Sequence, residues 1–235
     1  MLEPMKRLSA RGSSGRSSRG LTLVELLIGL AVGLFIVAGG VLLLSTQLRE
    51  HRSVLLEARL TQDLRSAADL IARDLRRAGH WGEAAAGVWS HDAPPLANPY
   101  TAVAPAGAAS DAASFRYSRD ASENHAVDAN EQFGYRLRNQ AIELQLGSGN
   151  WQALTDATVL AVTAFNVTPS VEEIALAELC TQPCPAGSAS CPPRQQVRSL
   201  AVQIVAHAVA DASIARSVRG AARLRNDPIL GACAG

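Results

Sequence analysis

The distribution of apolar residues divides the chain into four parts. Residues 1–20 are polar and basic, are rich in Ser and Gly, and have no periodic apolar pattern. From Leu21 to Leu44 the chain is almost continuously apolar, with Glu25 as the single charged residue. Apolar residues then recur every three or four positions, and shorter alternating patches follow. We therefore predict a leader at 1–20, a hydrophobic helix at 21–44, an amphipathic helix at 45–78 and a β-rich head at 79–235.

The apolar segment is long enough to cross a bilayer. Twenty-four residues form a helix of about 36 Å, whereas the hydrocarbon core is about 30 Å thick. Positive charge before a span favours the cytoplasmic side, which predicts that everything after Leu44 lies in the periplasm. Ala38-Gly39-Gly40 could imitate the cleavage site of a secretory signal, but the apolar run continues through it. A soluble secreted binding protein that starts near residue 41 is therefore only an alternative.

Glu25 lies where an unpaired charge is costly. An ionised carboxylate inside a bilayer costs about 2.5–3.5 kcal/mol on insertion scales, so we expect it to have a partner. A Glu near a helix end can reach the headgroups, which is one explanation. Cleavage between Gly20 and Leu21 is another, because it would create a free amino terminus one helical turn before the carboxylate.

The stretch Gly20-Leu21-Thr22-Leu23-Val24-Glu25-Leu26 resembles the prepilin signature of type IV pilins and type II secretion pseudopilins. The resemblance implies that a prepilin peptidase of the inner membrane cuts after Gly20 and methylates the new N-terminus at Leu21. It also implies that Glu25 pairs with the N-terminus of a neighbouring subunit and sets the register of assembly. The family most often has Phe where this chain has Leu21, a departure that the peptidase is expected to tolerate.

Four glycines interrupt the apolar segment. Gly29 and Gly33 have the small-xxx-small spacing that lets helices pack closely, although Gly is also simply more frequent in membrane helices. Gly39 and Gly40 weaken a helix by about 1 kcal/mol each relative to Ala. Many major pilins have a proline near this position and melt locally in the filament. This chain has no proline there, and we expect the glycine pair to give similar flexibility.

One apolar stripe continues through residues 45–78, and Gly79 is the expected C-cap. The stripe consists of Leu56, Leu60, Leu64, Ala67, Ile71, Leu75 and Ala78. The stretch RDLRRAGHWG at residues 73–82 is similar to the end of the long helix in the PilW class of minor pilins, and the J-class pseudopilins are the nearest alternative. Without the resemblance, His80 and Trp81 would be a packing pair at the helix terminus.

Strand patterns dominate the rest of the chain. Residues 83–112 are rich in Ala, Gly, Pro and Asn and predict a long loop. Alternating segments predict strands at 113–118, 132–138, 141–146, 151–154, 159–167, 197–209 and 217–225. The segments 132–138 and 141–146 would form a hairpin across Asn139-Gln140. One long helix followed by antiparallel strands is an α+β arrangement, and the resemblance implies the pilin-like version of it.

All four cysteines, Cys180, Cys184, Cys191 and Cys233, fall in the predicted exterior part. An even number of cysteines outside the cytoplasm favours disulfides, with three possible connectivities. We favour one bridge within residues 180–191 and one that joins this loop to Cys233. A zinc site is the alternative, but the spacing lacks paired C-x-x-C motifs and no His lies close in sequence. We therefore expect no metal.

The other polar residues suggest no catalytic site and no cofactor. The five His residues have no metal-ligand spacing, and no nucleophile, P-loop or dinucleotide motif is present. The leader has five basic residues and one acidic residue, a charge of +4, whereas the remaining 17 basic and 20 acidic residues give −3. No basic stripe outside the leader indicates nucleic-acid binding. An acidic group could hold calcium but fits no standard calcium loop, so we expect a solvated loop. This group consists of Asp120, Glu123, Asp128, Asn130 and Glu131.

The resemblance implies a structural subunit that is first held in the inner membrane, with its N-terminus in the cytoplasm, and later lies in a pilus at the cell surface. A PilW-like minor pilin would prime pilus assembly at or near the tip and support adhesion and twitching motility. Its partners would be the prepilin peptidase, other minor pilins, the major pilin and a large tip adhesin. A J-class pseudopilin of type II secretion is the alternative within the class. An uncleaved, membrane-anchored periplasmic enzyme or sensor is the alternative from another class.

Overall fold

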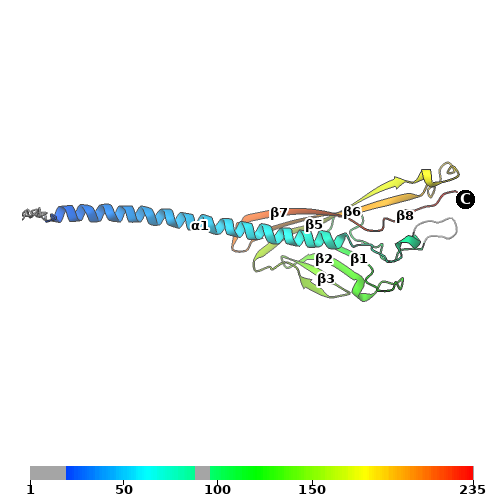
Figure 1. Cartoon of the computed structure of the whole chain (residues 1–235), viewed down its shortest axis with the longest axis horizontal. Helices are drawn as coiled ribbons and strands as arrows, with labels where there is room; N and C mark the ends of the chain where they lie inside the picture. Colours follow the sequence, from blue (N-terminus) through cyan, green and yellow to red (C-terminus); the bar gives the residue numbers. More distant parts are fainter. Residues whose placement is uncertain (1–19, 88–95, 235) are drawn as a thin grey trace, which may run out of the picture. The chain divides into compact units, whose positions relative to one another are not determined.

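The computed structural model describes residues 20–87 and 96–234 of the chain (Figure 1). The predicted leader therefore lies outside the described residues, apart from Gly20. The chain divides into two compact units, Met1–His51 and Arg52–Gly235. We call the second of these the head unit and describe each unit by itself.

In the first unit, the described residues form the N-terminal part of one helix, α1 (Leu23–Leu75). Between residues 20 and 51 every described residue is exposed except Ser45, which is half-buried. The helix continues without a break through Gly39 and Gly40. Among the described residues, α1 is the one helix that is long and apolar enough to cross a membrane.

The head unit combines the C-terminal part of α1 with two antiparallel sheets (Figure 1). The first sheet has the order β1 (Ala112–Arg116), β2 (Gln132–Arg138), β3 (Ala141–Leu146) and β4 (Trp151–Ala153). The second has the order β5 (Leu160–Ala175), β6 (Arg194–Ala208) and β7 (Asp211–Arg223), and β8 (Ile229–Leu230) pairs with β6. Three short 3-10 helices, Ala84–Gly87, Ala129–Glu131 and Ala177–Leu179, lie in the connections. The α+β, pilin-like fold class predicted from the sequence is therefore confirmed.

The predicted apolar stripe of α1 forms one side of the core. Its residues from Leu60 to Ala78 are buried, whereas Leu56 at its start is half-buried. The stripe belongs to one apolar cluster with inward residues of both sheets, among them Phe115, Tyr135, Phe165 and Ile204. In β6 the even-numbered residues from Leu200 to Ala208 are buried and the odd-numbered ones are not, as the period of a strand requires.

The helix ends three residues before the predicted end. At its C-terminus, Arg77 and Ala78 donate their backbone N–H groups to the carbonyls of Asp74 and Leu75, so three-residue bonds replace the four-residue bonds of an α-helix. Such tightening is common in a last helical turn. Gly79 follows with a left-handed φ of +77°, as expected of a C-cap glycine.

The strands follow the predicted pattern except in the second sheet. The β2–β3 hairpin turns at Asn139 and Gln140, both at positive φ, as predicted. β5 is eight residues longer at its C-terminal end than predicted, continuing from Val167 to Ala175, and β7 begins at Asp211 rather than 217. Pro169 lies within β5 opposite Leu200. A proline is tolerated there because β5 is an edge strand.

Two disulfides tie down the loop between β5 and β6. Cys184 is bonded to Cys191, and Cys180 is bonded to Cys233 near the C-terminus. One bridge thus lies within residues 180–191 and the other joins this loop to Cys233, the pairing favoured from the sequence. Because every sulfur is in a disulfide, a zinc site made by these residues would require both bridges to be reduced.

Candidate functional site

The predicted cleavage site lies immediately before α1. Gly20 and Leu21 are exposed and precede the first helical residue, Leu23. The backbone N–H of Glu25 donates to the Thr22 hydroxyl at 3.3 Å, and this hydroxyl lies 3.5 Å from a Glu25 carboxylate oxygen. Thr22 is therefore the N-cap, because its hydroxyl accepts from the backbone N–H three residues later.

This geometry is suited to processing and leaves Glu25 accessible. The Gly20–Leu21 peptide bond lies outside the helix and is open to an enzyme. The exposed Glu25 carboxylate is in the first turn of α1, where the helix dipole favours a negative charge. Its pairing with the N-terminus of a second subunit, and the cut and methylation at Gly20 and Leu21, stay predictions.

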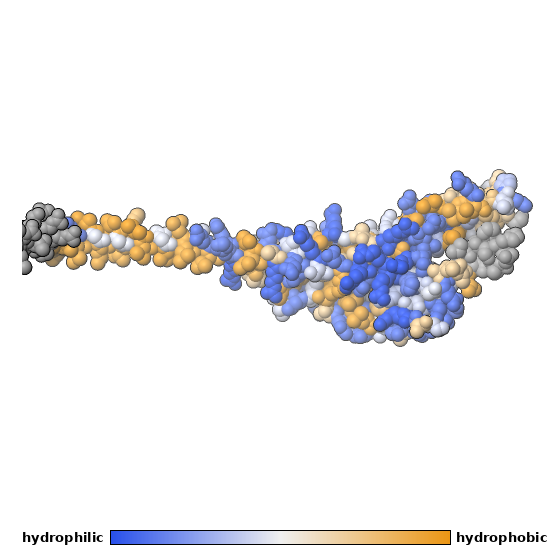
Figure 2. Space-filling view, in the orientation of Figure 1, coloured by the Kyte–Doolittle hydropathy of each residue, from blue (hydrophilic) through white to orange (hydrophobic). Residues whose placement is uncertain are grey.

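An unbroken apolar surface follows these residues along α1. The large hydrophobic side chains between Leu21 and Leu48 are 53–82% exposed. Figure 2 shows this apolar surface on the N-terminal part of the helix. A stable soluble monomer does not expose a contiguous apolar surface of this extent to water. This segment therefore requires a membrane or other helices around it.

No packing contact within the chain explains why the apolar segment has glycine at four positions. A Cβ added to Gly29, Gly33, Gly39 or Gly40 would meet no atom within 4 Å other than its chain neighbours and the adjacent backbone of the helix itself. The chain's own packing therefore does not require glycine at these positions. The predicted helix packing at Gly29 and Gly33 and the predicted flexibility at Gly39 and Gly40 are not tested by the structure.

The stretch at residues 73–82 attaches the end of α1 to the first sheet and to the segment that follows β1. Asp74 accepts a hydrogen bond of 2.7 Å from the Tyr135 hydroxyl in β2. The Arg77 guanidinium lies 4.2 Å from the centre of the Tyr117 ring. Leu75 between them is fully buried. The acidic, apolar and basic positions of this stretch therefore each have a separate contact in the head unit.

Gly79 is the meeting point of three segments. Its N–H donates to the Arg116 carbonyl at 2.8 Å, and its carbonyl accepts from the side-chain amides of Asn98 and Asn226 at 3.0 and 2.9 Å. A Cβ at this position would lie 2.7 Å from the Arg225 carbonyl oxygen, so only glycine fits.

The prediction that His80 and Trp81 form a packing pair is wrong. Trp81 is 2% exposed, whereas His80 is exposed. The ring of Trp81 instead meets His125 edge-on, with centroids 5.8 Å apart. His125 comes from the loop at residues 120–131, which contains the acidic group and is called the acidic loop below. This loop lies about forty residues later in the chain, so the sequence pattern gave no signal for the contact.

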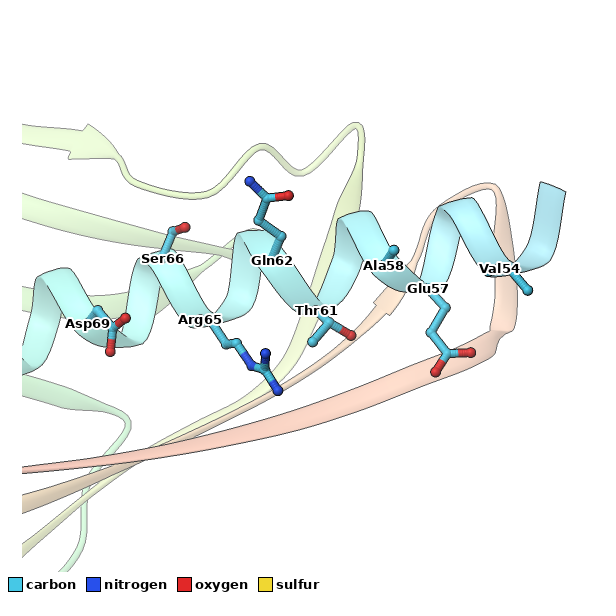
Figure 3. Close-up of a pocket in the computed structure, with 8 residues that line it drawn as sticks. All are labelled: Val54, Glu57, Ala58, Thr61, Gln62, Arg65, Ser66 and Asp69. Atoms are coloured by element: carbon cyan, nitrogen blue, oxygen red, sulfur yellow. The ribbon is translucent and has the colours of Figure 1, made fainter. Parts of the chain in front are cut away.

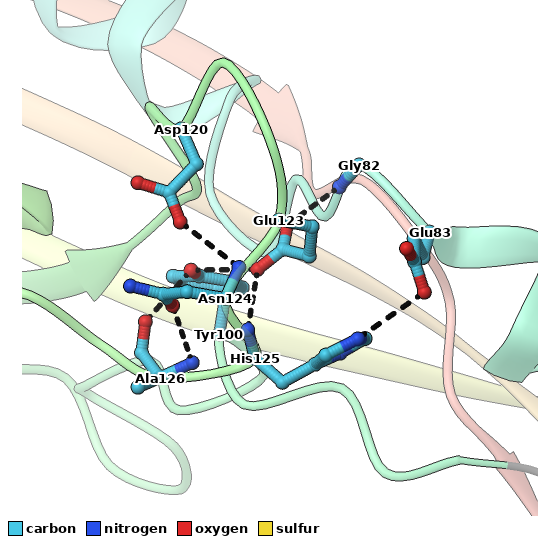
Figure 4. A network of polar contacts seen from close by, with 8 residues as sticks. All are labelled: Gly82, Glu83, Tyr100, Asp120, Glu123, Asn124, His125 and Ala126. Carbon is cyan, nitrogen blue, oxygen red and sulfur yellow. Dashed lines mark hydrogen bonds and ion pairs between the residues drawn. The ribbon is translucent and has the colours of Figure 1, made fainter.

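We predicted a solvated acidic loop from the sequence, but this loop is partly buried. Glu131 is fully buried and accepts hydrogen bonds from the backbone N–H groups of Arg119 at 2.6 Å and Asp128 at 2.9 Å. The hydroxyl of buried Tyr100 lies 3.1 Å from Glu131. The same hydroxyl lies 3.0 Å from Glu123 (Figure 4). Burial, together with these carboxylates, raises the pKa of Tyr100.

Other contacts attach this loop to the chain after α1. Gly82 donates its N–H to Glu123 at 3.1 Å, and His125 lies 3.2 Å from Glu83 (Figure 4). Burial acts to raise the pKa of Glu123, but hydrogen bonds from Ser118, Gly82, Tyr100 and His125 outweigh burial and lower this pKa. The network therefore holds a structural loop in place. Among the described residues, the one group close enough to share a metal ion is that of Cys180, Cys184 and Cys191.

A shallow groove runs along the outer face of α1 in the head unit (Figure 3). It has a volume of about 760 Å³ and is lined by α1 residues alone, including Thr61, Arg65 and Asp69. Glu57, also on its wall, forms an ion pair with Arg216 of β7. An open groove on a single helix does not enclose a substrate, whereas another helix can lie against it.

Two family profiles match the chain, one near its N-terminus and one over most of its length. Residues 15–41 match the family profile described as "Prokaryotic N-terminal methylation motif", which includes the Gly20–Leu21 bond and Glu25. Residues 53–224 match the profile described as "Prepilin peptidase-dependent protein B". No curated protein and no solved structure matches the chain. Since the second match spans most of its length, the chain belongs to the prepilin peptidase-dependent protein B family, as a pilin-like protein with an N-terminal methylation motif.

Proposed function

We propose that this protein is a minor pilin of the type IV pilus, similar to the PilW class. It is cut after Gly20 by prepilin peptidase, methylated at Leu21 and built into the filament at or near the tip. The observation that carries the proposal is the match to the methylation motif at residues 15–41, which includes most of the exposed apolar part of α1.

Assembly would transfer the apolar part of α1 from lipid to a bundle of equivalent helices. Both environments exclude water, so the transfer itself adds little hydrophobic free energy. The charge of Glu25 makes one register preferable, because a buried unpaired carboxylate is penalised and an opposing amino terminus offsets that cost. The exposed position of Glu25 in the first turn of α1 supports this role.

The proposed location follows from the same segment. The basic leader stays in the cytoplasm, α1 crosses the inner membrane, and the head unit lies in the periplasm until assembly carries it to the cell surface. Two disulfides in the head unit support an oxidising compartment. The proposed role is structural rather than enzymatic.

The proposed partners are other minor pilins, the major pilin and a large tip adhesin, in addition to the peptidase. Together with the other minor pilins the protein would prime assembly, and twitching motility and adhesion would depend on it. A J-class pseudopilin of type II secretion is the second candidate, because it is the nearest alternative to the PilW class for the stretch at residues 73–82.

Genetic complementation tests the proposal and separates the two candidates. In a strain that lacks the gene, the wild-type chain should restore surface pili and twitching and leave type II secretion unchanged. Restored secretion without pili would instead establish the pseudopilin.

Glu25→Ala should reach the membrane in normal amount but enter filaments at least about tenfold less, a loss equal to about 1.4 kcal/mol. The matched control is Glu178→Ala, which removes an exposed carboxylate in the head unit. Quantitative immunoblots of membranes and sheared filaments measure both variants. Equal incorporation of Glu25→Ala and wild type would contradict the role of Glu25.

A further inference from the structure

The two disulfides of the head unit lie beside each other. The Sγ atoms of Cys180, Cys184 and Cys191 are all within 4.8 Å of one another. Cys180 is bonded to Cys233, and Cys184 is bonded to Cys191. All four sulfur atoms therefore form one cluster. Three of the cysteines come from the β5–β6 loop, and Cys233 comes from the C-terminal tail, which begins at Ile229 in β8.

Thiol–disulfide exchange requires a thiolate that can reach a sulfur atom of an existing disulfide. At 4.8 Å or less, a sulfur released from the Cys184–Cys191 bond lies beside the Cys180–Cys233 bond. We propose that this cluster is a thiol–disulfide exchange site. In the exchange, Cys184 replaces Cys233 as the disulfide partner of Cys180, and the C-terminal tail is released. The inference goes beyond the proposed function and does not depend on it.

Burial and backbone contacts assign the attacking role to Cys184. Cys191 is buried, and its N–H donates to the Ser188 hydroxyl at 3.1 Å. Cys184 is half-buried, and residues 181–183 and 185–187 around it are exposed. Within residues 181–187, the one backbone hydrogen bond to another described residue is accepted by the carbonyl of Pro185. Cys184 is thus both more accessible and less restrained than Cys191.

The exchange consists of two balanced steps. An external dithiol reduces the Cys184–Cys191 bond, becomes a disulfide itself and leaves two thiols in the protein. The Cys184 thiolate then attacks the Sγ of Cys180, the Cys180–Cys184 bond forms, and the Cys180–Cys233 bond breaks. Cys233 leaves as a thiolate and takes a proton from water, so the second step needs no further reductant.

The released tail would have few remaining contacts. β8 pairs with β6 at two positions, Arg194 with Leu230 and Gln195 with Ile229. Beyond β8, Ala232 donates its N–H to the Ser190 carbonyl at 2.9 Å. After exchange, the thiol of Cys233 would be available for a mixed disulfide with a thiol of another protein.

Two variants test the exchange without any reductant, because each leaves a single free thiol beside the Cys180–Cys233 bond. The full-length Cys191→Ser and Cys184→Ser proteins are purified in detergent, incubated at pH 8 and low concentration, and trapped with N-ethylmaleimide. Mass spectrometry of peptides then locates the label. In Cys191→Ser, we expect labelling of Cys233 to be at least about tenfold above that of wild type, with a Cys180–Cys184 peptide. In Cys184→Ser, we expect the label to remain on Cys191.

Label that stays on Cys184 in Cys191→Ser, with the Cys180–Cys233 peptide intact, would overturn the proposal. Equal labelling of Cys233 in both variants would overturn the assignment of Cys184 as the attacking residue. If a variant fails to fold, wild-type protein partly reduced with dithiothreitol gives the same answer. A Cys180–Cys184 peptide supports exchange there, whereas joint labelling of Cys184 and Cys191 beside an intact Cys180–Cys233 peptide contradicts it.

Discussion

Gly79 shows how one residue can fix the relation between α1 and the strands of the head unit. The sequence predicts a C-cap there, since Gly follows the last residue of the apolar stripe. It does not predict that the Arg225 carbonyl lies where a Cβ would be, because Arg225 is far away in the chain. The conformational requirement was therefore predictable and the contact was not.

Gly79→Ala should lower the free energy of unfolding of the head unit by about 2 kcal/mol or more. The positive φ is unfavourable for Ala, and the Cβ would lie 2.7 Å from the Arg225 carbonyl oxygen. Gly107→Ala is the matched control, because its Cβ would meet no atom within 4 Å. Urea denaturation of the full chain in detergent measures both. Equal stability of the two variants would contradict the account of Gly79.

Tyr135 should make the head unit sensitive to alkaline pH. Burial, followed by the hydrogen bond to Asp74, raises the pKa of Tyr135 above its ordinary value of 10.0. The folded state therefore retains a proton that the unfolded state loses, so this contribution is complete below pH 10 and decreases as the pH rises further. The decrease is at most about 1.4 kcal/mol per pH unit for one such group.

Tyr135→Phe should lower stability at pH 7 by about 1–2 kcal/mol, because it removes the hydrogen bond to Asp74. Above pH 10 its stability should fall less steeply than that of wild type. Denaturation curves between pH 7 and 11 compare the slopes. Identical slopes would show that another group causes the alkaline sensitivity.

The burial of Glu131 and its contact with Tyr100 were not predicted from the sequence. From the sequence, Glu131 looks like one more charge in a polar loop. Its burial depends on Tyr100, which comes from a loop thirty-one positions earlier, and on two backbone donors. A buried carboxylate satisfied by such distant groups leaves no periodic pattern, whereas the apolar stripe of α1 does.

At the scale of elements, the regular spacing of apolar residues along α1 was the most informative feature of the sequence. The predicted stripe from Leu60 to Ala78 is buried, and it faces both sheets of the core. The pattern works because a helix repeats every 3.6 residues, so neighbouring stripe positions share one face. The same element supplies a prediction with a control of identical chemistry.

Leu64→Ala should lower the free energy of unfolding by about 2–5 kcal/mol, since Leu64 is 1% exposed and its loss leaves a cavity. Leu55→Ala, on the same helix at a position 71% exposed, should change it by less than about 0.5 kcal/mol. Near-ultraviolet circular dichroism during urea titration compares the two. A similar loss in both variants would mean that the head unit does not bury this face of α1.

The extension of β5 was not predictable from its own residues. Residues 168–175 contain Pro169 and two glutamates and lack the alternation that identifies a strand. Their strand conformation comes from pairing with β6, in the register of Ser170 with Ser199 and Ala175 with Arg194. Pairing partners are set by the tertiary fold, which local patterns do not contain.

At the scale of the whole molecule, one profile match covers the N-terminal methylation motif and the other covers most of the head unit. The cysteine count and the prepilin signature predicted an exported, disulfide-containing pilin-like protein from the sequence alone. The choice between pilus and secretion pseudopilus depends on surfaces that meet other subunits. These surfaces carry no signature in a single chain, so the PilW-like role stays a proposal.

The central claim is that the chain is processed as a prepilin. N-terminal mass spectrometry of the protein recovered from native membranes or sheared filaments tests it most directly. The account predicts a mature peptide that begins at Leu21 and carries one N-methyl group. A peptide that begins at Met1 would instead indicate an uncleaved membrane anchor, and one that begins near residue 41 would indicate a secreted protein. Either result would contradict the proposed function.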